Sequence, residues 1–141
     1  MVPRSDEMIG GIIVSHGKLA EELLNALNII LGEAVNIEAI SIGWYDDVEE
    51  SKIKINQSLK RVDQKNGVLI FTDMFGGTPS NLSFTFLKDS QVDIITGVNL
   101  PMLIKFVSLQ RSYDLKEVAR KVVEQGQKNI HLASALLSTH S

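Results

Sequence analysis

The histidine at position 16 stands where a run of apolar residues changes into a helical pattern. The stretch GGIIVSHGKLAEELL, residues 10–24, is apolar until it reaches Ser-His-Gly, and leucines at helical spacing follow directly. A neutral imidazole nitrogen can act as a nucleophile near neutral pH. The two other histidines, His131 and His140, lie in the last expected strand and in the tail. His16 is therefore the candidate for chemistry, although a histidine at a helix start can also be a simple cap or packing residue.

An aspartate takes the corresponding place after another apolar run. Asp73 directly follows GVLIFT, residues 67–72. A carboxylate that accepts the proton of one ring nitrogen fixes the imidazole tautomer and leaves the other nitrogen exposed. We predict that Asp73 accepts the Nδ1 proton of His16, so that Nε2 is the attacking nitrogen. An aspartate considered alone at this place is equally well explained as a turn residue.

The sequence GGTPSN, residues 76–81, predicts an anion-binding site beside the histidine. Two glycines allow close approach of the backbone, and a helix start offers unpaired N–H groups and the positive end of its dipole. Alone, such a stretch is more often an ordinary loop with a Thr-Pro helix start. Placed beside His16, it becomes a seat for a phosphoryl group. The predicted phosphoryl-binding residues are Gly76, Gly77, Thr78, Ser80 and Asn81.

Four further residues follow predicted strands and are candidates for the rim of the same site. In open parallel sheets, ligands collect beyond the carboxyl ends of the strands. The side chain of Trp44 either lines this rim or covers the core. The rim candidates are Ser15, Gly17, Trp44 and Asn99.

Short apolar runs alternate along the chain with longer amphipathic ones, which predicts strands alternating with helices. The predicted strands cover residues 9–14, 37–42, 67–72, 92–96 and 128–133. The predicted helices cover residues 18–31, 47–62, 79 to about 87, 101 to about 110, and 115–125. Thr78 is the expected N-cap of the third helix, and Gly126 is the expected stop of the last.

This alternation predicts an α/β fold with an open parallel sheet of four strands and helices on both faces. We expect the strand order 2-1-3-4. Residues 128–133 would add a more polar final strand. The length fits one domain, which we expect over residues 8–135, after a disordered or non-native lead-in at 1–7 and before a tail at 136–141.

Composition excludes several classes of function. The 141 residues include no cysteine, which rules out disulfides, thiolate catalysis and cysteine-based zinc sites. The net charge is −3 with the charges mixed, so a basic nucleic-acid surface is not expected. There is no run long enough to span a membrane and no export signal. We therefore expect a cytoplasmic protein that binds no nucleic acid.

Three chemical readings differ in what they require of these residues. A phosphohistidine carrier needs only a nucleophilic imidazole and phosphoryl-oxygen donors, with no metal and no cofactor. A hydrolase using Ser15 and His16 is disfavoured, because neighbouring residues at a strand end point in different directions and no G-x-S-x-G elbow exists. A regulatory phosphate- or nucleotide-binding module lacks both nucleotide fingerprints. A metal site fails because His16 and Asp73 do not complete a coordination sphere.

Three segments together resemble a known family. The segments IIVSHG (residues 12–17), FTDMFGGTPSN (71–81) and TGVNLPML (96–103) are similar, in order and spacing, to the mannose-family IIA domain of the bacterial phosphoenolpyruvate-dependent sugar phosphotransferase system (PTS). The resemblance covers Met8 to about Ala135. Asp73 matches the family's aspartate that hydrogen-bonds the active histidine, and Thr78 stands where many members carry serine.

The resemblance implies a role in sugar uptake. His16 would accept a phosphoryl group from the carrier HPr and pass it to a separate IIB subunit, which serves the membrane IIC and IID subunits. The final strand would pair antiparallel with a second copy in a homodimer. A related subunit of dihydroxyacetone kinase systems is the alternative, but its loop after the third strand differs from residues 76–79. The transported sugar is not readable from this chain.

Overall fold

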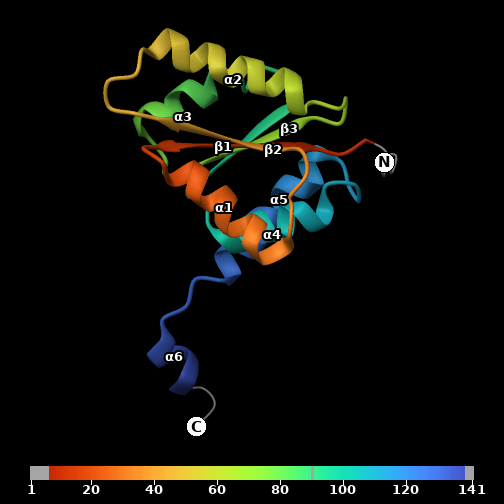
Figure 1. Ribbon diagram of the computed structural model, residues 1–141. Coiled ribbons are helices and arrows are strands. Elements are labelled where there is room, and N and C mark those ends of the chain that lie inside the picture. The colour runs from red at the N-terminus through yellow and green to blue at the C-terminus, as the bar shows by residue number, and fades with distance from the viewer. Residues whose placement is uncertain (1–6, 90, 139–141) are drawn as a thin grey trace.

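The computed structural model describes residues 7–89 and 91–138, in which four strands alternate with four helices and two further helices follow (Figure 1). The elements are β1 (Gly10–His16), α1 (Leu19–Leu31), β2 (Ile37–Ile42), α2 (Val48–Val62), β3 (Val68–Thr72), α3 (Gly77–Phe84), β4 (Val92–Thr96), α4 (Leu100–Leu109), α5 (Leu115–Lys128) and α6 (Ala133–Ser138). The first four predicted strands are confirmed, and two of them, β2 and β4, have the predicted bounds.

The four strands form one parallel sheet in the order β2-β1-β3-β4. This order confirms the predicted topology. It places β1 in the interior of the sheet, with β2 on one side and β3 on the other. In register, His16 lies beside Ile42 and Val14 lies beside Thr72, so the residues that follow these strands emerge at one edge. The sheet therefore brings the loops after β1, β2 and β3 together.

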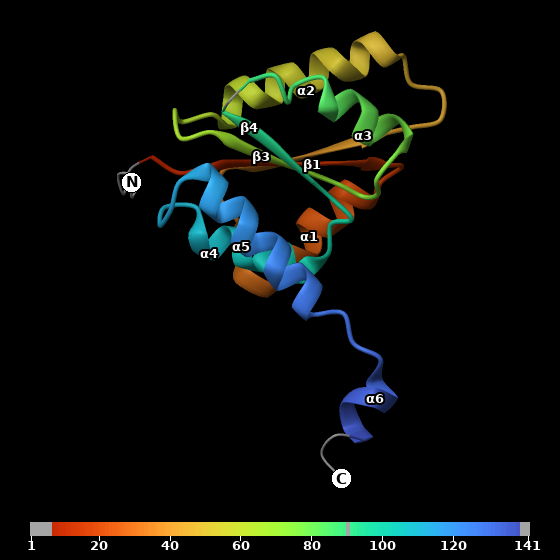
Figure 2. The same cartoon turned by 180° about the vertical axis from the view of Figure 1, so that it is seen from behind.

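Helices cover both faces of the sheet, as Figures 1 and 2 show, with α2 and α3 on one face and α1, α4 and α5 on the other. Alternate residues of β1 serve the two faces: Ile13 packs with Leu27 and Phe106, whereas Ile12 packs with Ile55. A strand covered on both faces needs an uninterrupted apolar run. Ile12 and Ile13 are fully buried, and this double burial fixes the strand that carries His16.

Two predicted helix boundaries are wrong for identifiable reasons. Thr78 does not cap α3, because the helix already begins at Gly77 and Gly76 occupies the N-cap position. Gly126 does not end α5, which continues to Lys128. A Cβ at position 126 would overlap the side chain of Met102, so this glycine serves the close packing of α5 on α4.

The predicted strand at residues 128–133 is not formed in the described chain. Lys128 is the last residue of α5 and Ala133 is the first of α6, with no strand between them. This segment leads away from the sheet (Figures 1 and 2), so it has no neighbouring backbone among the described residues with which to pair. The sequence ASALLS instead favours the short helix α6.

The structure describes only part of the expected lead-in and of the expected tail. Residues 1–6 of the expected lead-in lie outside the described residues, but the carbonyl of Glu7 accepts a hydrogen bond from Asn66 Nδ2 at 2.6 Å. Glu7 is therefore attached to the domain. At the other end, the expected boundary at 135 falls inside α6, and residues 139–141 are outside the described part. None of the described helices combines the length and apolar character needed to cross a bilayer.

Candidate active site

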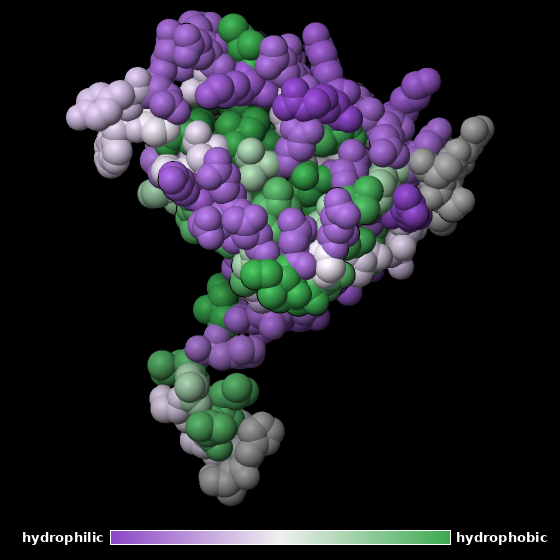
Figure 3. All heavy atoms as spheres, viewed as in Figure 1, coloured by the Kyte–Doolittle hydropathy of each residue, from purple (hydrophilic) through white to green (hydrophobic). Residues whose placement is uncertain are grey.

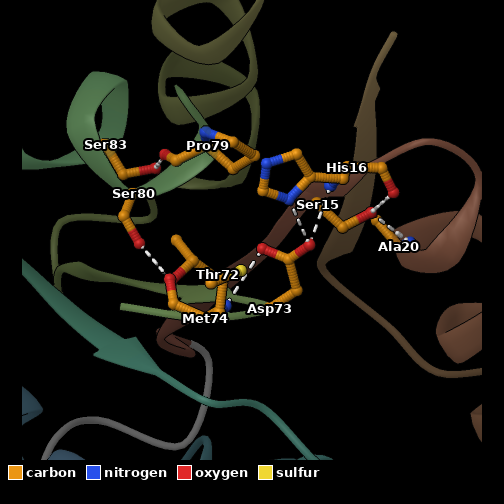
Figure 4. A network of polar contacts seen from close by, with 9 residues as sticks. All are labelled: Ser15, His16, Ala20, Thr72, Asp73, Met74, Pro79, Ser80 and Ser83. Atoms are coloured by element: carbon orange, nitrogen blue, oxygen red, sulfur yellow. Dashed lines mark hydrogen bonds and ion pairs between the residues drawn. The ribbon is translucent and has the colours of Figure 1, made fainter. Parts of the chain in front are cut away.

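His16 and Asp73 are joined by hydrogen bonds at the carboxyl ends of β1 and β3 (Figure 4). Nδ1 of His16 lies 2.7 Å from Oδ2 of Asp73, and the same oxygen accepts the backbone N–H of His16 at 2.9 Å. The Asp73 side chain is 10% exposed, whereas that of His16 is 43% exposed. The imidazole is thus held along one edge and open at the other. The structure brings together the two residues that the sequence pairs.

The environment of Asp73 favours its ionised form. Burial acts to raise its pKa, but the hydrogen bonds from the His16 backbone N–H and ring, together with the charge of that ring, outweigh burial, and the pKa of Asp73 is lowered. Its other oxygen, Oδ1, accepts the backbone N–H of Met74 at 3.0 Å. A carboxylate that stays ionised can orient the ring and stabilise positive charge on it.

Ser15 holds the turn that follows β1 and is fully buried. Its hydroxyl accepts the backbone N–H of Ala20 at 2.6 Å and donates to the carbonyl of His16 at 3.1 Å. Gly17 then adopts a φ of 54°, and its N–H donates to the carbonyl of Ile42 at 2.8 Å. Ser15 therefore satisfies a donor at the start of α1 and fixes the backbone of His16. It is a positioning residue and does not extend into the rim as predicted.

The start of α3 lies against the open edge of the His16 ring. Gly77 has a φ of 81°, and a Cβ added to it would lie 3.0 Å from both Nε2 and Cε1 of His16. The backbone of α3 can approach the ring this closely because residue 77 has no side chain. The nitrogen that faces Gly77 is Nε2, the nitrogen that the bond from Nδ1 to Asp73 leaves open.

Two of the predicted phosphoryl-binding residues are used differently. The side chain of Ser80 is fully buried, where its hydroxyl donates to the carbonyl of Met74 and lies 3.1 Å from Thr72 Oγ1. It thereby anchors the loop that carries Asp73 (Figure 4). In an α-helix that begins at Gly77, the N–H groups of Ser80 and Asn81 belong to the internal ladder. The unpaired donors expected of this helix start are those of residues 76–78.

Asn99 is a helix cap. Its Oδ1 accepts the backbone N–H of Met102 at 3.0 Å, and its Nδ2 donates to the carbonyl of Gly126 at 3.2 Å. Both ends of the amide are thus occupied in joining α4 to α5. The sequence places Asn99 correctly after β4, but its role at the rim is not supported.

A hollow of about 370 Å³ is lined by five of the predicted residues, namely His16, Gly17, Trp44, Gly77 and Thr78. Gly76 is not among its lining residues. Three sides of this hollow therefore come from the loops after β1, β2 and β3. Sequence reasoning did not single out the other lining residues, which are Ile42, Gly43, Asp46 and Val48. Their only signal was their place at the end of the second predicted strand or shortly after it.

No cluster of three or more potential metal-ligating side chains occurs among residues 7–89 and 91–138. The site instead combines an imidazole, a carboxylate and a helix start. Such a set can hold a neutral imidazole, expose one of its nitrogens, and offer N–H donors to an anion beside it. The fold and this edge define a class of parallel α/β domain whose site is centred on one carboxylate-held histidine.

Comparisons with known proteins assign the chain to a family within this class. A family model described as "PTS system fructose IIA component" matches residues 10–123. The "PTS system fructose-specific EIIA component" of Bacillus subtilis is 31% identical over 128 residues, which cover 90% of this chain and 88% of that protein. The "PTS system mannose-specific EIIAB component" of Escherichia coli K12 is also 31% identical over 128 residues, covering 88% of this chain but 39% of that protein.

A solved structure agrees with these relatives. The "Mannose/sorbose specific IIA subunit of phosphotransferase system from Enterococcus faecalis" superposes with a TM-score of 0.79 at 27% identity, covering 89% of this chain and 94% of that one. The chain belongs to the fructose/mannose EIIA family of the bacterial sugar phosphotransferase system. This confirms the resemblance predicted from the three sequence segments. A IIA component of this system is a phosphotransfer component.

Proposed function

We propose that this chain carries a phosphoryl group on Nε2 of His16, accepting it from HPr and passing it to a IIB subunit of a mannose-family sugar transporter. The observation that carries the proposal is the position of the His16 ring between Asp73 and the start of α3. Nδ1 is held at 2.7 Å by a carboxylate, and Nε2 faces a helix start with no side chain in the way.

The chemistry follows from this arrangement. The Nε2 lone pair of neutral His16 attacks the phosphorus of the donor's phosphohistidine, and the donor's P–N bond breaks as the new one forms. The donor imidazole leaves as a neutral ring when its other nitrogen carries a proton. The phosphorylated His16 ring then bears positive charge, which Asp73 stabilises through the Nδ1 proton.

The start of α3 serves the transferred group. The phosphoryl oxygens carry negative charge throughout the transfer, and stabilisation comes from donors fixed in advance around them. The N–H groups of residues 76–78 and the hydroxyl of Thr78 are the donors expected here. Transfer of the phosphoryl group from His16 to a IIB subunit uses the same geometry, with Nε2 as the leaving nitrogen. No metal and no cofactor take part in this scheme.

We also propose that two copies of the chain associate through the C-terminal segment. Ile130 and Leu132 are more than 70% exposed, and Leu137 is 70% exposed on α6. Figure 3 shows apolar side chains gathered on α6, apart from the body of the domain, whose visible face mixes polar and apolar side chains. At the same time β4 has only β3 as a neighbour among the described strands. Exchange of this segment between copies would bury these side chains and cover the edge of β4.

Sedimentation at micromolar concentration tests the association. The full chain should sediment with twice its mass, and a chain ending at residue 128 should sediment as a monomer. A full chain that remains monomeric at this concentration would contradict the proposed exchange of the C-terminal segment.

Phosphate uptake from phosphorylated HPr tests the carrier function. His16→Ala should abolish uptake of acid-labile phosphate. Asp73→Ala should preserve the fold and slow uptake by about 100-fold or more, because the ring loses its orientation but keeps its nucleophile. Nitrogen-15 NMR of the phosphorylated protein should place the group on Nε2. Phosphate on Nδ1, or uptake by the His16→Ala variant, would contradict the proposal.

A further inference from the structure

Two buried hydroxyl groups connect the strand that precedes Asp73 to the helix that follows it. Thr72 is the last residue of β3, and Ser80 is the fourth residue of α3. Both side chains are fully buried, and their hydroxyl oxygens lie 3.1 Å apart (Figure 4). The Ser80 hydroxyl also donates to the carbonyl of Met74, which lies in the loop between the two elements. The hydroxyls of Thr72 and Ser80 therefore brace the loop that carries Asp73.

Met74 connects these hydroxyls to the carboxylate of Asp73. The N–H of Met74 donates to Asp73 Oδ1 at 3.0 Å, and its carbonyl accepts the Ser80 hydroxyl. The other carboxylate oxygen, Oδ2, accepts the backbone N–H of His16 and lies 2.7 Å from Nδ1 of its ring. A continuous chain of hydrogen bonds therefore runs from the imidazole through Asp73 and the main chain of Met74 to a hydroxyl buried on α3.

The same helix lies against the other nitrogen of the ring. A Cβ on Gly77 would be 3.0 Å from Nε2 of His16, and Ser80 follows Gly77 by about one helical turn. The carboxylate that holds Nδ1 and the backbone that faces Nε2 are thus linked through the side chain of Ser80. Groups that orient a reacting atom act well only when bonds of their own hold them to within about 0.5 Å.

We propose that Ser80, assisted by Thr72, is a positioning residue for phosphoryl transfer to His16. Ser80 fixes the separation between Asp73 and the start of α3, and with it the place of the ring between them. Because the Ser80 hydroxyl donates to Met74, its lone pairs accept the hydroxyl of Thr72, which orients it. This inference rests on the carrier function proposed above, and it adds two buried residues that act on the reaction through Asp73.

Ser83 provides a matched control on the same helix. Its side chain is also fully buried, but its hydroxyl donates to the carbonyl of Pro79 at 2.7 Å, within α3 (Figure 4). Ser80→Ala and Ser83→Ala each remove one buried hydroxyl from α3, and the first alone removes a bond to the Asp73 loop. A second pair of variants compares Thr72→Val, which loses the hydroxyl and keeps the shape, with Thr72→Ser, which keeps the hydroxyl.

Nitrogen-15 NMR of the His16 ring, which requires no phosphoryl donor, measures the positioning. In the unchanged chain, at a pH where the ring is neutral, the two shifts should show a proton on Nδ1 and none on Nε2. Ser80→Ala should move the two shifts toward each other, because a carboxylate that is less well fixed holds a single tautomer less well. Ser83→Ala should leave both shifts in place. Unchanged shifts in Ser80→Ala, or equal changes in the two variants, would overturn the proposal.

The rate of phosphate uptake from phosphorylated HPr measures the consequence. Ser80→Ala should lower the maximal rate by about tenfold or more, since a small displacement of the ring is enough to slow transfer. The HPr concentration that gives half the maximal rate should stay within about twofold, because a fully buried hydroxyl cannot contact the donor. Ser83→Ala should change both quantities by less than about twofold. Equal rate losses in Ser80→Ala and Ser83→Ala would show a purely structural role and overturn the proposal.

The variants of Thr72 test whether this residue acts through Ser80. Thr72→Ser should keep more of the maximal rate than Thr72→Val. The double variant Thr72→Val, Ser80→Ala should be no slower than Ser80→Ala, because the hydroxyl of Thr72 has no further effect once that of Ser80 is absent. Rate losses that multiply in the double variant would show that Thr72 acts independently of Ser80, and would overturn its assigned role.

The two measurements allow the two proposals to fail separately. If the unchanged chain takes up no phosphate, the carrier function is wrong, and the NMR comparison of Ser80→Ala with Ser83→Ala still decides the positioning. If Ser80→Ala takes up phosphate at the unchanged rate, the positioning role is wrong and the carrier function stands. If Ser80→Ala does not fold, the Thr72 pair decides: Thr72→Val should move the ring shifts more than Thr72→Ser, and equal shifts in the two would overturn the proposal.

Discussion

The starts of α3 and α4 lie at the same edge of the sheet and treat their backbone donors in opposite ways. At α4, the Asn99 side chain accepts the N–H of Met102 at 3.0 Å. The aspartates before α2 and α5 do the same for their helices, with Asp47 bonded to Glu49 and Asp114 bonded to residue 117. At α3, the N-cap is Gly76, and no side-chain capping bond is found there among the described residues.

The difference is that the start of α3, unlike the starts of α2, α4 and α5, has no side-chain cap, and under the proposed function its first N–H groups are available to the phosphoryl group. A side-chain cap contributes about 1 kcal/mol to a helix, and α3 forgoes it. The carboxylate of Asp73, three residues before Gly76, bonds instead to His16 and to the N–H of Met74. What α3 gains is close approach, because Gly77 lies against Nε2 of His16. The cap of α4 joins this helix to α5, whereas the uncapped start of α3 fits the access to His16 that the proposed function requires.

Gly77→Ala should break this access and give the largest effect. The new Cβ would lie 3.0 Å from Nε2, where the phosphoryl group must arrive, so the rate of phosphate uptake from HPr should fall by about 100-fold or more. The φ of 81° also makes alanine unfavourable there by about 1–2 kcal/mol.

Gly76→Ala is the matched control for that strain. Its φ of 88° is also unfavourable for alanine, but a Cβ there would meet nothing within 4 Å. Both variants should therefore lose free energy of unfolding, while Gly76→Ala keeps a much larger share of the uptake rate. Equal rate losses in the two variants would show that strain, and not the approach to Nε2, explains the result.

Asn99→Ala tests the other side of the comparison. Loss of the cap should lower the free energy of unfolding by about 1 kcal/mol. Uptake should change little, because Asn99 bonds to Met102 and Gly126 and not to His16.

Thr78→Ala should have the opposite effect, namely a several-fold loss of the uptake rate and little loss of stability, because Thr78 lines the hollow and is exposed. Urea unfolding and uptake rates measure the two variants side by side. If the uptake rate falls in Asn99→Ala and not in Thr78→Ala, Asn99 acts at the rim of the site after all.

The sequence was informative wherever a local signal and the sheet topology agreed. The apolar runs before His16 and Asp73 predicted two strands, and parallel strands must bring the ends of neighbours together, so the His16–Asp73 pair could be inferred without coordinates. The glycines before α3 were likewise visible as a place of close approach. The family resemblance supplied what these signals alone left open, namely the choice among the three kinds of chemistry.

The sequence could not say how each polar side chain is used once the chain has folded. Ser15, Ser80 and Asn99 all follow strands or open a helix, and in each the structure turns the side chain to a backbone group. A hydroxyl that anchors a loop and one that binds a ligand have the same sequence signature. The predicted final strand is not formed in the described chain for a different reason. A strand requires a neighbouring backbone, and residues 128–133 have none within the described chain.

The smallest expected effect concerns the acid stability that Asp73 provides through its bonds to His16. Because its pKa is lowered in the folded protein, Asp73 contributes stability that is fully present above about pH 4, the usual value for an unfolded aspartate, and is lost as the pH falls through the lowered pKa. The difference in free energy of unfolding between the unchanged chain and Asp73→Asn should therefore shrink as the pH falls below 4, measured by urea unfolding.

Glu38→Gln is the matched control, because Arg61 lowers the pKa of Glu38 and this ion pair does not include His16. The acid dependence of stability that is due to Glu38 should therefore persist in a His16→Ala background. The acid dependence due to Asp73 should weaken in that background, because two of the donors that hold the carboxylate ionised belong to His16 and the ring is one of them. If the acid dependence due to Asp73 is unchanged in the His16→Ala background, the ring does not keep the carboxylate ionised. The difference between the capped start of α4 and the uncapped start of α3 would then be unrelated to the histidine.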